Sequence, residues 1–237
     1  MPKLNTVGFT PPPDFPVEAY NKVHQCLNKY KDTHEVQWAL FGLGWNGLAY
    51  RYRAMAEYDE EFTNSVKISG NSPPPEERYK QGKALFDFFV NAVSVIECFS
   101  FSIYCIASII KPDVFPVSQS GDLEFTPTNF AERFDINFQN DSLSVAIQQC
   151  FHDSTYWKMN DIRRVLIHRG MSPRRFYKGG ERNGMATMPT NLPAPSDQWR
   201  FDFSVDEQTT TMFRKWLGDA LKELVDSSVD FCTGRLP

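Results

Sequence analysis

The sequence predicts an all-α protein, an up-and-down bundle of five to seven helices with a Pro/Gly-rich insert. Three observations lead to this fold class. Apolar residues recur at steps of three and four through most of the chain, which is the period of an amphipathic helix. One long run, from about Glu76 to Ile110, is apolar on nearly all sides over its second half, as a central core helix would be. Prolines and glycines concentrate in residues 171–205, before a last amphipathic segment.

The composition is that of a folded domain. The chain has 237 residues, of which 41% are hydrophobic and 23% charged, so it can bury one sizeable core, and we expect a single domain over residues 1–237. The formal net charge of −4 argues against a protein that binds nucleic acid over its whole surface. A local basic patch is still compatible with that total.

The cysteines and histidines do not have the pattern of a metal centre. The five cysteines are odd in number and widely spaced, and most stand in apolar helical runs, which favours buried free thiols over disulfides. No Cys-x-x-Cys pair occurs and the four histidines lack the spacing of metal ligands, so we expect neither a metal nor another cofactor. The first 15 residues contain three consecutive prolines and no apolar core, unlike a signal peptide. We therefore expect a cytoplasmic protein.

The first part of the chain predicts an extended arm and two helices. Residues 1–16 are rich in proline and should form the arm. Apolar residues at helical steps predict helices over residues 17–30 and 35–62. Residues 69–75, which include three consecutive prolines, should form a linker before the long helix.

Three glycines stand inside the second predicted helix. Gly42, Gly44 and Gly47 each cost about 1 kcal/mol relative to Ala, so we expect a neighbouring helix to approach closely there. A phosphate-binding loop is the alternative. It has little support, because no strand precedes these glycines and no Lys-Ser/Thr follows them.

The long helix also has the length of a membrane span. From Val90 to Ile110 it is apolar over a length that could cross a bilayer. Glu97 lies near the middle of this stretch, where a carboxylate costs about 3 kcal/mol in membrane insertion, and no basic cluster flanks it. We therefore expect a helix buried in a bundle and no membrane partner.

Three shorter helices should follow. Thr126 should cap a helix that ends near residue 134, and a second helix should cover residues 142–151. Asp153 or Ser154 should cap the third, which runs to Arg169.

The insert and the final helix complete the predicted fold. In the insert, residues 174–177 and 199–205 alternate enough to form two extended segments, which could pair as a hairpin. The last helix should begin at Asp206 or Thr209 and end near residue 231.

The residues best suited to catalysis or binding lie close together on the third short helix. Because a helix turns about 100° per residue, Asp161, Arg164 and His168 share one face, with Arg163 beside it. Gly170 should end the helix. The same pattern also fits a solvated basic helix end. The apolar residues fall on another side, where they can bury against a neighbouring helix: Met159, Ile162 and Leu166.

An Arg followed by four residues and a His, Arg163 to His168, on a helix that ends in Arg-Gly, resembles the motif of the HEPN family of small all-α proteins. Many members have Asn directly after this Arg, where this chain has Arg164. The order of the elements from residue 126 to residue 169 also resembles that of uncharacterised bacterial HEPN-like proteins. The resemblance implies a ribonuclease of the toxin or defence kind, in which two motifs face each other across a homodimer.

The motif residues have the chemistry that RNA cleavage without a metal requires. The reaction needs a base for the 2′-hydroxyl proton, a cation for the phosphate charge and an acid for the leaving oxygen. His168 is suited to the acid or base role because histidine titrates near neutral pH. Arg163 and Arg164 can bind a phosphate bidentately. RNA would then be the substrate, and an antitoxin or another protein a partner.

Further residues are expected to support this site. Glu97 needs a donor, because an unpaired buried charge is costly, and Arg163 or Arg164 is the natural one. Such a pair could equally be structural. Arg169 and Arg174, together with the basic residues that follow, should extend the positive patch.

Two other functions stay open. One is an inactive dimer that binds RNA, a nucleotide or a protein partner. It would explain why Arg164 stands at the usual Asn position and why the net charge of the chain is negative. The third is a purely structural interaction protein, in which neither Arg163 nor His168 lies near a pocket or a dimer axis. Tyr156 and Trp157 precede the motif and could either stack on a base or pack in the core.

Overall fold

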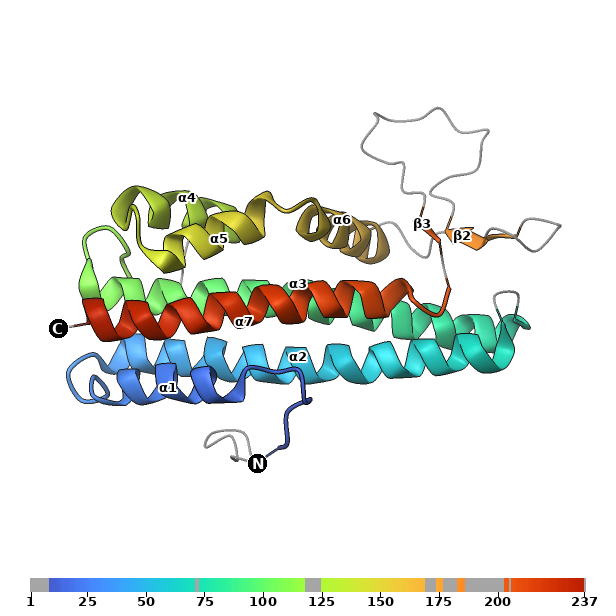
Figure 1. Ribbon diagram of the computed structural model, residues 1–237, viewed down its shortest axis with the longest axis horizontal. Coiled ribbons are helices and arrows are strands. Elements are labelled where there is room, and N and C mark those ends of the chain that lie inside the picture. Colours follow the sequence, from blue (N-terminus) through green and yellow to red (C-terminus); the bar gives the residue numbers. More distant parts are fainter. Residues whose placement is uncertain are drawn as a thin grey trace. The chain divides into compact units, whose positions relative to one another are not determined.

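The computed structural model describes residues 9–70, 73–117, 125–168, 174–176, 183–185, 203–204 and 206–236. In these ranges the chain forms seven α-helices and three short strands (Figure 1). The helices are α1 (Val17–Asn28), α2 (Glu35–Ser69), α3 (Pro75–Ile110), α4 (Pro127–Asn137), α5 (Ser142–His152), α6 (Ser154–His168) and α7 (Thr209–Arg235). The strands are β1 (Arg174–Phe176), β2 (Asn183–Met185) and β3 (Phe203–Ser204). The predicted all-α bundle is confirmed for this part of the chain.

Side-chain caps define the starts of α4, α5 and α6, whereas Pro16 before α1 makes no side-chain cap. The Thr126 side chain accepts a hydrogen bond from the Asn129 amide at 3.3 Å, as predicted for α4. Of the two caps considered for α6, the structure has Asp153, whose Oδ1 accepts from the Thr155 amide at 2.7 Å. The largest error is the end of α2, which continues to Ser69 instead of residue 62. Its last turns are rich in Ser and Thr, which are weak helix formers.

The chain divides into two compact units, each built from segments that are distant in sequence. Unit 1 comprises Met1–Arg53, Ser94–Tyr156 and Leu217–Pro237, and unit 2 comprises Ala54–Val93 and Trp157–Trp216. Helices α2, α3, α6 and α7 each contribute residues to both units. The expectation of a single domain stays a prediction.

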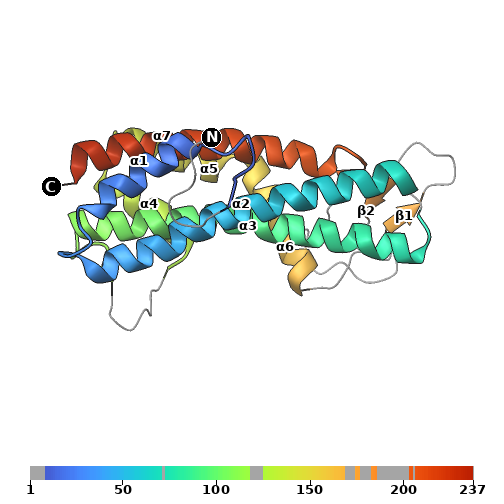
Figure 2. The same cartoon turned by 90° about the horizontal axis from the view of Figure 1, so that it is seen from below.

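In unit 1, α1 runs alongside α2 (Figure 2) and is fixed to it by one aromatic pair. The Tyr20 ring stacks on the fully buried Trp45 with centroids 4.9 Å apart. The Tyr20 hydroxyl donates to the Trp45 carbonyl at 2.9 Å, and Trp45 Nε1 donates to the Tyr20 carbonyl at 3.2 Å. Two large rings are thus buried with their polar atoms satisfied, as such side chains require.

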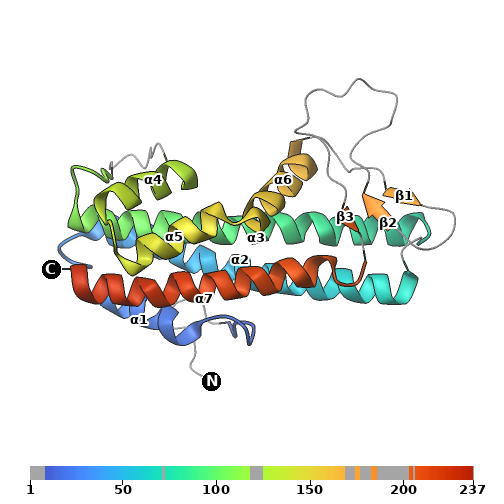
Figure 3. The same ribbon diagram turned by 45° about the horizontal axis from the view of Figure 1, so that its top comes forward.

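A second aromatic cluster of unit 1 holds α4 against α3 and α7. Phe115 stacks on Phe138 at 5.9 Å and meets Tyr104 of α3 edge-on at 5.5 Å. Phe134 lies 5.2 Å from Phe231 of α7. Figure 3 shows α5 side by side with α4. The rings hold α4 in place by burying its apolar face.

In its described part, residues 9–16, the predicted arm is less extended than its prolines predict, and residues 1–8 lie outside the described residues. Phe15 is only 5% exposed, and its ring lies 5.3 Å from both Tyr20 and Tyr52. Its amide donates to the Pro12 carbonyl at 3.1 Å, which closes a turn. The described end of the arm is therefore part of the core of unit 1.

The glycines of α2 differ in how closely α3 approaches them. A Cβ at Gly44 would lie 2.5 Å from Ser102 Oγ and 3.2 Å from the Cys98 carbonyl oxygen, and one at Gly47 would lie 3.1 Å from Cys98 Sγ. A Cβ at Gly42 would have no neighbour within 4 Å. The predicted close approach is confirmed at Gly44 and Gly47 and is wrong at Gly42.

We expect Gly44→Ala to lower the free energy of unfolding by about 1–3 kcal/mol, the usual cost of overpacking. The Cys98 carbonyl is backbone and cannot move aside as a side chain can. Gly42→Ala is the matched control and should raise stability by up to about 1 kcal/mol, because Ala favours the helix and meets no obstacle. Urea denaturation of both variants measures the effects. Equal changes at the two positions would contradict the close approach.

Unit 2 is built from the second part of α2, the first part of α3, most of α6 and the start of α7. Phe89 of α3 meets Phe213 of α7 edge-on at 5.2 Å, and both rings are buried. The ammonium group of Lys158 on α6 lies 5.9 Å from the Phe213 ring centroid. Phe213 therefore contacts two other helices in the core of this unit.

Helix α3 is the one helix in the described ranges that is long and apolar enough to cross a membrane. In its most apolar window of 18 residues, 72% of the helix is buried inside the protein. A buried core helix of a soluble bundle has the same length and composition, so this feature is weak evidence for a membrane span.

The three strands form an antiparallel sheet with the order β1-β2-β3. Arg174 pairs with Met185 and Gly184 pairs with Ser204. Residues 174–176 and 203–204, the described parts of the two predicted extended segments, are strands, but each pairs with β2, so the direct pairing proposed for them is wrong. The strand between them was missed because Asn-Gly-Met has no alternating pattern.

Candidate functional site

Helix α6 carries the predicted site, and its apolar residues orient it. Met159, Ile162 and Leu166 are 0%, 2% and 6% exposed, which confirms the predicted buried stripe. The other side of the helix is more open, with Asp161 half-buried and Arg164 exposed. The spacing that produces the stripe therefore also leaves the polar face of α6 accessible.

Asp161 and Arg164 form an ion pair on this face. Arg164 Nη1 lies 3.8 Å from Asp161 Oδ1, and the two side chains are 64% and 43% exposed. A solvated pair one helical turn apart contributes only about 0.3–0.5 kcal/mol, so little energy is needed to separate it. Arg164 can exchange this carboxylate for another anion.

The two residues of the motif lie on the same helix. Arg163 is half-buried, between the polar face and the apolar stripe. His168 is the last residue of α6, and only its backbone belongs to the described part of the chain. Arg169 and Gly170 lie outside the described residues. The helix thus extends through the motif to His168.

Glu97 is less buried than the sequence predicts. It lies on α3 and is half-buried, although the helix around it is apolar. Glu97 belongs to unit 1, whereas Arg163 and Arg164 belong to unit 2. The pairing between this carboxylate and a motif arginine stays a prediction.

The basic insert follows α6 closely in sequence. Arg174 begins β1, and the backbones of Arg174 and Arg175 are held by pairing with β2. The basic residues at 178 and 182 lie outside the described ranges. The paired strand β1 therefore begins six residues, in sequence, after the last residue of the motif helix.

The aromatic residues that precede the motif have different environments. Tyr156 is 3% exposed and meets Phe151 edge-on at 4.9 Å, so it packs in the core. Trp157 is 41% exposed. Because Trp157 is four residues before Asp161 and seven before Arg164, it shares their face of α6. Of the two rings, Trp157 is therefore the more exposed.

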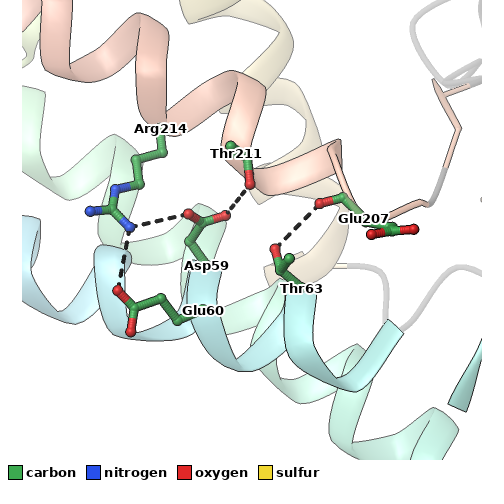
Figure 4. A network of polar contacts seen from close by, with 6 residues as sticks. All are labelled: Asp59, Glu60, Thr63, Glu207, Thr211 and Arg214. Carbon is green, nitrogen blue, oxygen red and sulfur yellow. Dashed lines mark hydrogen bonds and ion pairs between the residues drawn. The ribbon is translucent and has the colours of Figure 1, made fainter. Parts of the chain in front are cut away.

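A polar network in unit 2, shown in Figure 4, was not predicted from the sequence. The side chain of Asp59 on α2 is only 7% exposed. Its Oδ2 accepts a hydrogen bond from Arg214 Nη1 of α7 at 3.2 Å. Its Oδ1 accepts from the Thr211 hydroxyl at 3.0 Å. Arg214 Nη1 also lies 3.8 Å from Glu60, whose side chain is 71% exposed. The buried carboxylate is thus held by a cation and a hydroxyl, as a buried charge requires.

A further contact joins the same two helices. The Thr63 hydroxyl of α2 donates to the Glu207 carbonyl just before α7 at 3.3 Å (Figure 4). Together with the pair of Asp59 and Arg214, it fixes the start of α7 against α2 within unit 2. These groups are bound to one another, so we interpret the network as structural.

The cysteines are all free, and three are buried as the sequence predicts: Cys105, Cys150 and Cys232. Burial raises the pKa of Cys105 and of Cys150 to about 12, and it also raises the pKa of Cys232. Cys26 and Cys98 are half-buried. The buried thiols stay protonated near neutral pH and are therefore poor nucleophiles.

We expect the free energy of unfolding to fall as the pH rises above about 8.5, where thiols of the unfolded chain lose their protons. The folded protein keeps the protons of Cys105, Cys150 and Cys232, so it binds more protons than the unfolded chain. Each thiol should contribute a slope of about 1.4 kcal/mol per pH unit. Urea titrations from about pH 7 to pH 10 measure this slope, and Cys105→Ala should make it shallower. An unchanged slope would refute this origin of the pH dependence.

Within the described ranges, no group of three or more His, Cys, Asp or Glu side chains is arranged to hold a metal ion. No protein-family model matches the chain, and comparisons with curated proteins and with solved structures find no significant match.

Proposed function

We propose that the protein is a HEPN-like endoribonuclease of the toxin or defence kind, which cleaves single-stranded RNA without a metal in the cytoplasm. Its active site would combine α6 from two copies of the chain, because one His cannot serve as both acid and base in the same step. In a dimer with a two-fold axis, the second chain contributes the second His. A protein antitoxin is the expected partner.

The observation that carries this proposal is the orientation of α6. Its apolar stripe is buried, while Trp157, Asp161 and Arg164 are accessible on the face that His168 shares by helical spacing. Among the described residues, Arg164 pairs with a solvated carboxylate, which it can exchange for a phosphate. The exposed Trp157 could stack on a base of a single strand.

In this reaction, one His168 would take the proton of the 2′-hydroxyl, which attacks the adjacent phosphorus. The bond from phosphorus to the 5′-oxygen breaks, and the partner's His168 would protonate that oxygen. Arg163 and Arg164 would stabilise the negative charge on the phosphate oxygens. The products would be a 2′,3′-cyclic phosphate and a 5′-hydroxyl.

The test is a cleavage assay with purified protein, labelled single-stranded RNA and an excess of chelator. The preparation has to be free of any neutralising partner. We expect cleavage with 2′,3′-cyclic phosphate ends. RNA that stays intact, with the protein folded by circular dichroism, would refute the proposed activity.

A second function is favoured by one observation, the ion pair between Arg164 and Asp161 at the position where many HEPN proteins have Asn. An inactive dimer that binds RNA, a nucleotide or a protein could retain this pair. Binding of labelled RNA without any cleavage would support the inactive dimer. Cleavage that is lost in a variant of His168 while RNA binding persists would exclude it.

A further inference from the structure

The outer face of α6 carries an aromatic ring and a cation in line with the position of the motif histidine. Trp157 is 41% exposed, and the side chain of Arg164, seven residues later, is 64% exposed. His168 follows eleven residues after Trp157, so the three positions lie within about 20° of one line along the helix. All three belong to unit 2. We refer to Trp157, Arg164 and His168 as the α6 row.

The two groups of the row whose side chains are described are those that bind a single nucleic-acid strand. One exposed aromatic ring is common on a protein surface and needs no explanation by itself. A flat indole can stack on a base of any type, and a guanidinium can bind the phosphate of the same strand. The combination on one face therefore indicates a strand that runs along α6.

The carboxylate between the ring and the cation restricts where a phosphate can bind. Asp161 stands four residues after Trp157 and three before Arg164, and its side chain is 43% exposed. A carboxylate repels a phosphate at its own level of the helix. The favourable place for a phosphate is therefore at Arg164 or beyond it, towards His168.

The rise of the helix sets the distance from the ring to that phosphate. At about 1.5 Å per residue, Arg164 lies about 10.5 Å and His168 about 16.5 Å beyond Trp157 along the helix axis. A strand advances roughly 3.4 Å per nucleotide when stacked as in a duplex, and roughly twice that when it is extended with its bases splayed. An extended strand covers this separation with two or three nucleotides.

We propose that Trp157 is a base-binding residue of the RNA site, which stacks on an unpaired base two or three nucleotides from the scissile phosphate. The inference rests on the proposed function, which places the scissile phosphate at Arg164 and His168. It adds a requirement on the substrate. The RNA has to be single-stranded at this base as well as at the cut, whereas the type of the base matters little.

The first test measures the binding of strands that cannot be cleaved. RNA in which every 2′-hydroxyl is methylated has no nucleophile, so its dissociation constant does not depend on catalysis. For a strand of about six nucleotides, Trp157→Ala should raise the dissociation constant about 5- to 150-fold, as the loss of one stacked base does. The increase should be smaller for a dinucleotide, which is too short to reach from the ring to Arg164.

Two further variants control for the fold and for the stacking. Tyr79→Ala is the matched control, because Tyr79 on α3 is a 59% exposed ring of the same unit and lies outside the α6 row. It should leave the dissociation constant unchanged. Trp157→Phe keeps a flat ring and should recover part of the affinity that Trp157→Ala loses. All these variants should keep the wild-type circular dichroism.

The dependence on salt separates stacking from charge. Arg164→Met should reduce the slope of the logarithm of the dissociation constant against the logarithm of the salt concentration by about 0.7, the value for one phosphate contact on a single strand. Trp157→Ala should leave this slope unchanged, because the indole carries no charge. A slope reduced by Trp157→Ala would show that the substitution disturbs the phosphate contacts instead of a stacked base.

The position of the stacked base is tested with the wild-type protein, so that no variant has to fold. After the cut in a labelled RNA has been mapped, one abasic nucleotide is placed at each position on either side of it. Cleavage should slow most when the abasic nucleotide is two or three positions from the cut. In Trp157→Ala the same abasic nucleotide should cause little further loss, because the two changes remove one contact.

The failure of this proposal differs from the failure of the proposed function. Equal affinities of the wild-type protein and Trp157→Ala for the methylated strand would overturn the role of Trp157, even if RNA is cleaved. Abasic nucleotides that slow cleavage only next to the cut would overturn it too. RNA that stays intact, together with binding of the methylated strand that depends on Trp157, would refute the nuclease and support the base-binding residue.

Discussion

Replacing His168 with Ala is expected to slow RNA cleavage by about 100- to 10,000-fold, the usual contribution of a positioned acid or base. In the dimer, His168 of one chain would accept a proton as the new bond to phosphorus forms. The partner's His168 would donate a proton as the bond to the 5′-oxygen breaks. Cleavage rates with excess enzyme measure the chemical step, and binding of labelled RNA is measured separately. We expect the affinity for RNA to change little, because the arginines of α6 remain.

His152 provides the matched control for this experiment. It is the last residue of α5, as His168 is of α6, and it is exposed. Its Nδ1 lies 2.8 Å from the Gln148 carbonyl oxygen of its own helix. His152→Ala should cleave RNA at the wild-type rate. Equal rates for the wild-type protein and His168→Ala would remove His168 from the mechanism.

Replacing Arg214 with Met is expected to lower the free energy of unfolding by about 3–5 kcal/mol. The substitution keeps most of the side-chain length but removes the cation beside Asp59, whose carboxylate is 7% exposed. Of the partners among the described residues, the Thr211 hydroxyl alone would then bind this charge. Denaturation by urea, followed by circular dichroism, measures the loss.

Two further variants separate the buried pair from the exposed charge beside it. Glu60→Gln removes a carboxylate that is 71% exposed and 3.8 Å from the same guanidinium, and should change stability by less than about 1 kcal/mol. Asp59→Asn combined with Arg214→Met leaves no unpaired charge and should recover much of the loss. If the double variant were as unstable as Arg214→Met, the loss would come from packing and not from charge.

The helices could be predicted from the sequence because their determinants are local. Apolar residues at steps of three and four predicted the buried stripe of α6, and the cap residue Thr126 predicted the start of α4. The same reasoning gave the close approach at Gly44 but also at Gly42, where nothing approaches. A glycine reduces helix propensity wherever it stands, and only the packed structure shows which one has a neighbour.

Long-range partners could not be predicted. Asp59 and Arg214 are 155 residues apart, and no spacing rule connects them. Glu97 was assigned a motif arginine because its helix is apolar, yet exposure depends on which side of that helix faces the core, and Glu97 is half-buried. For the candidate site, sequence spacing predicted the shared face of Asp161 and Arg164. It could not show that Trp157 on that face is exposed while Tyr156 is packed.

The burial of Phe15 against Tyr20 and Tyr52 has a practical consequence for shortened forms of the protein. A truncation designed from the helix boundaries would start at Val17 and remove this ring. Two buried tyrosines would then lose a neighbouring ring of a kind that buries about 150–250 Å² of surface. The smallest autonomously folding fragment should therefore begin before the turn at Pro12.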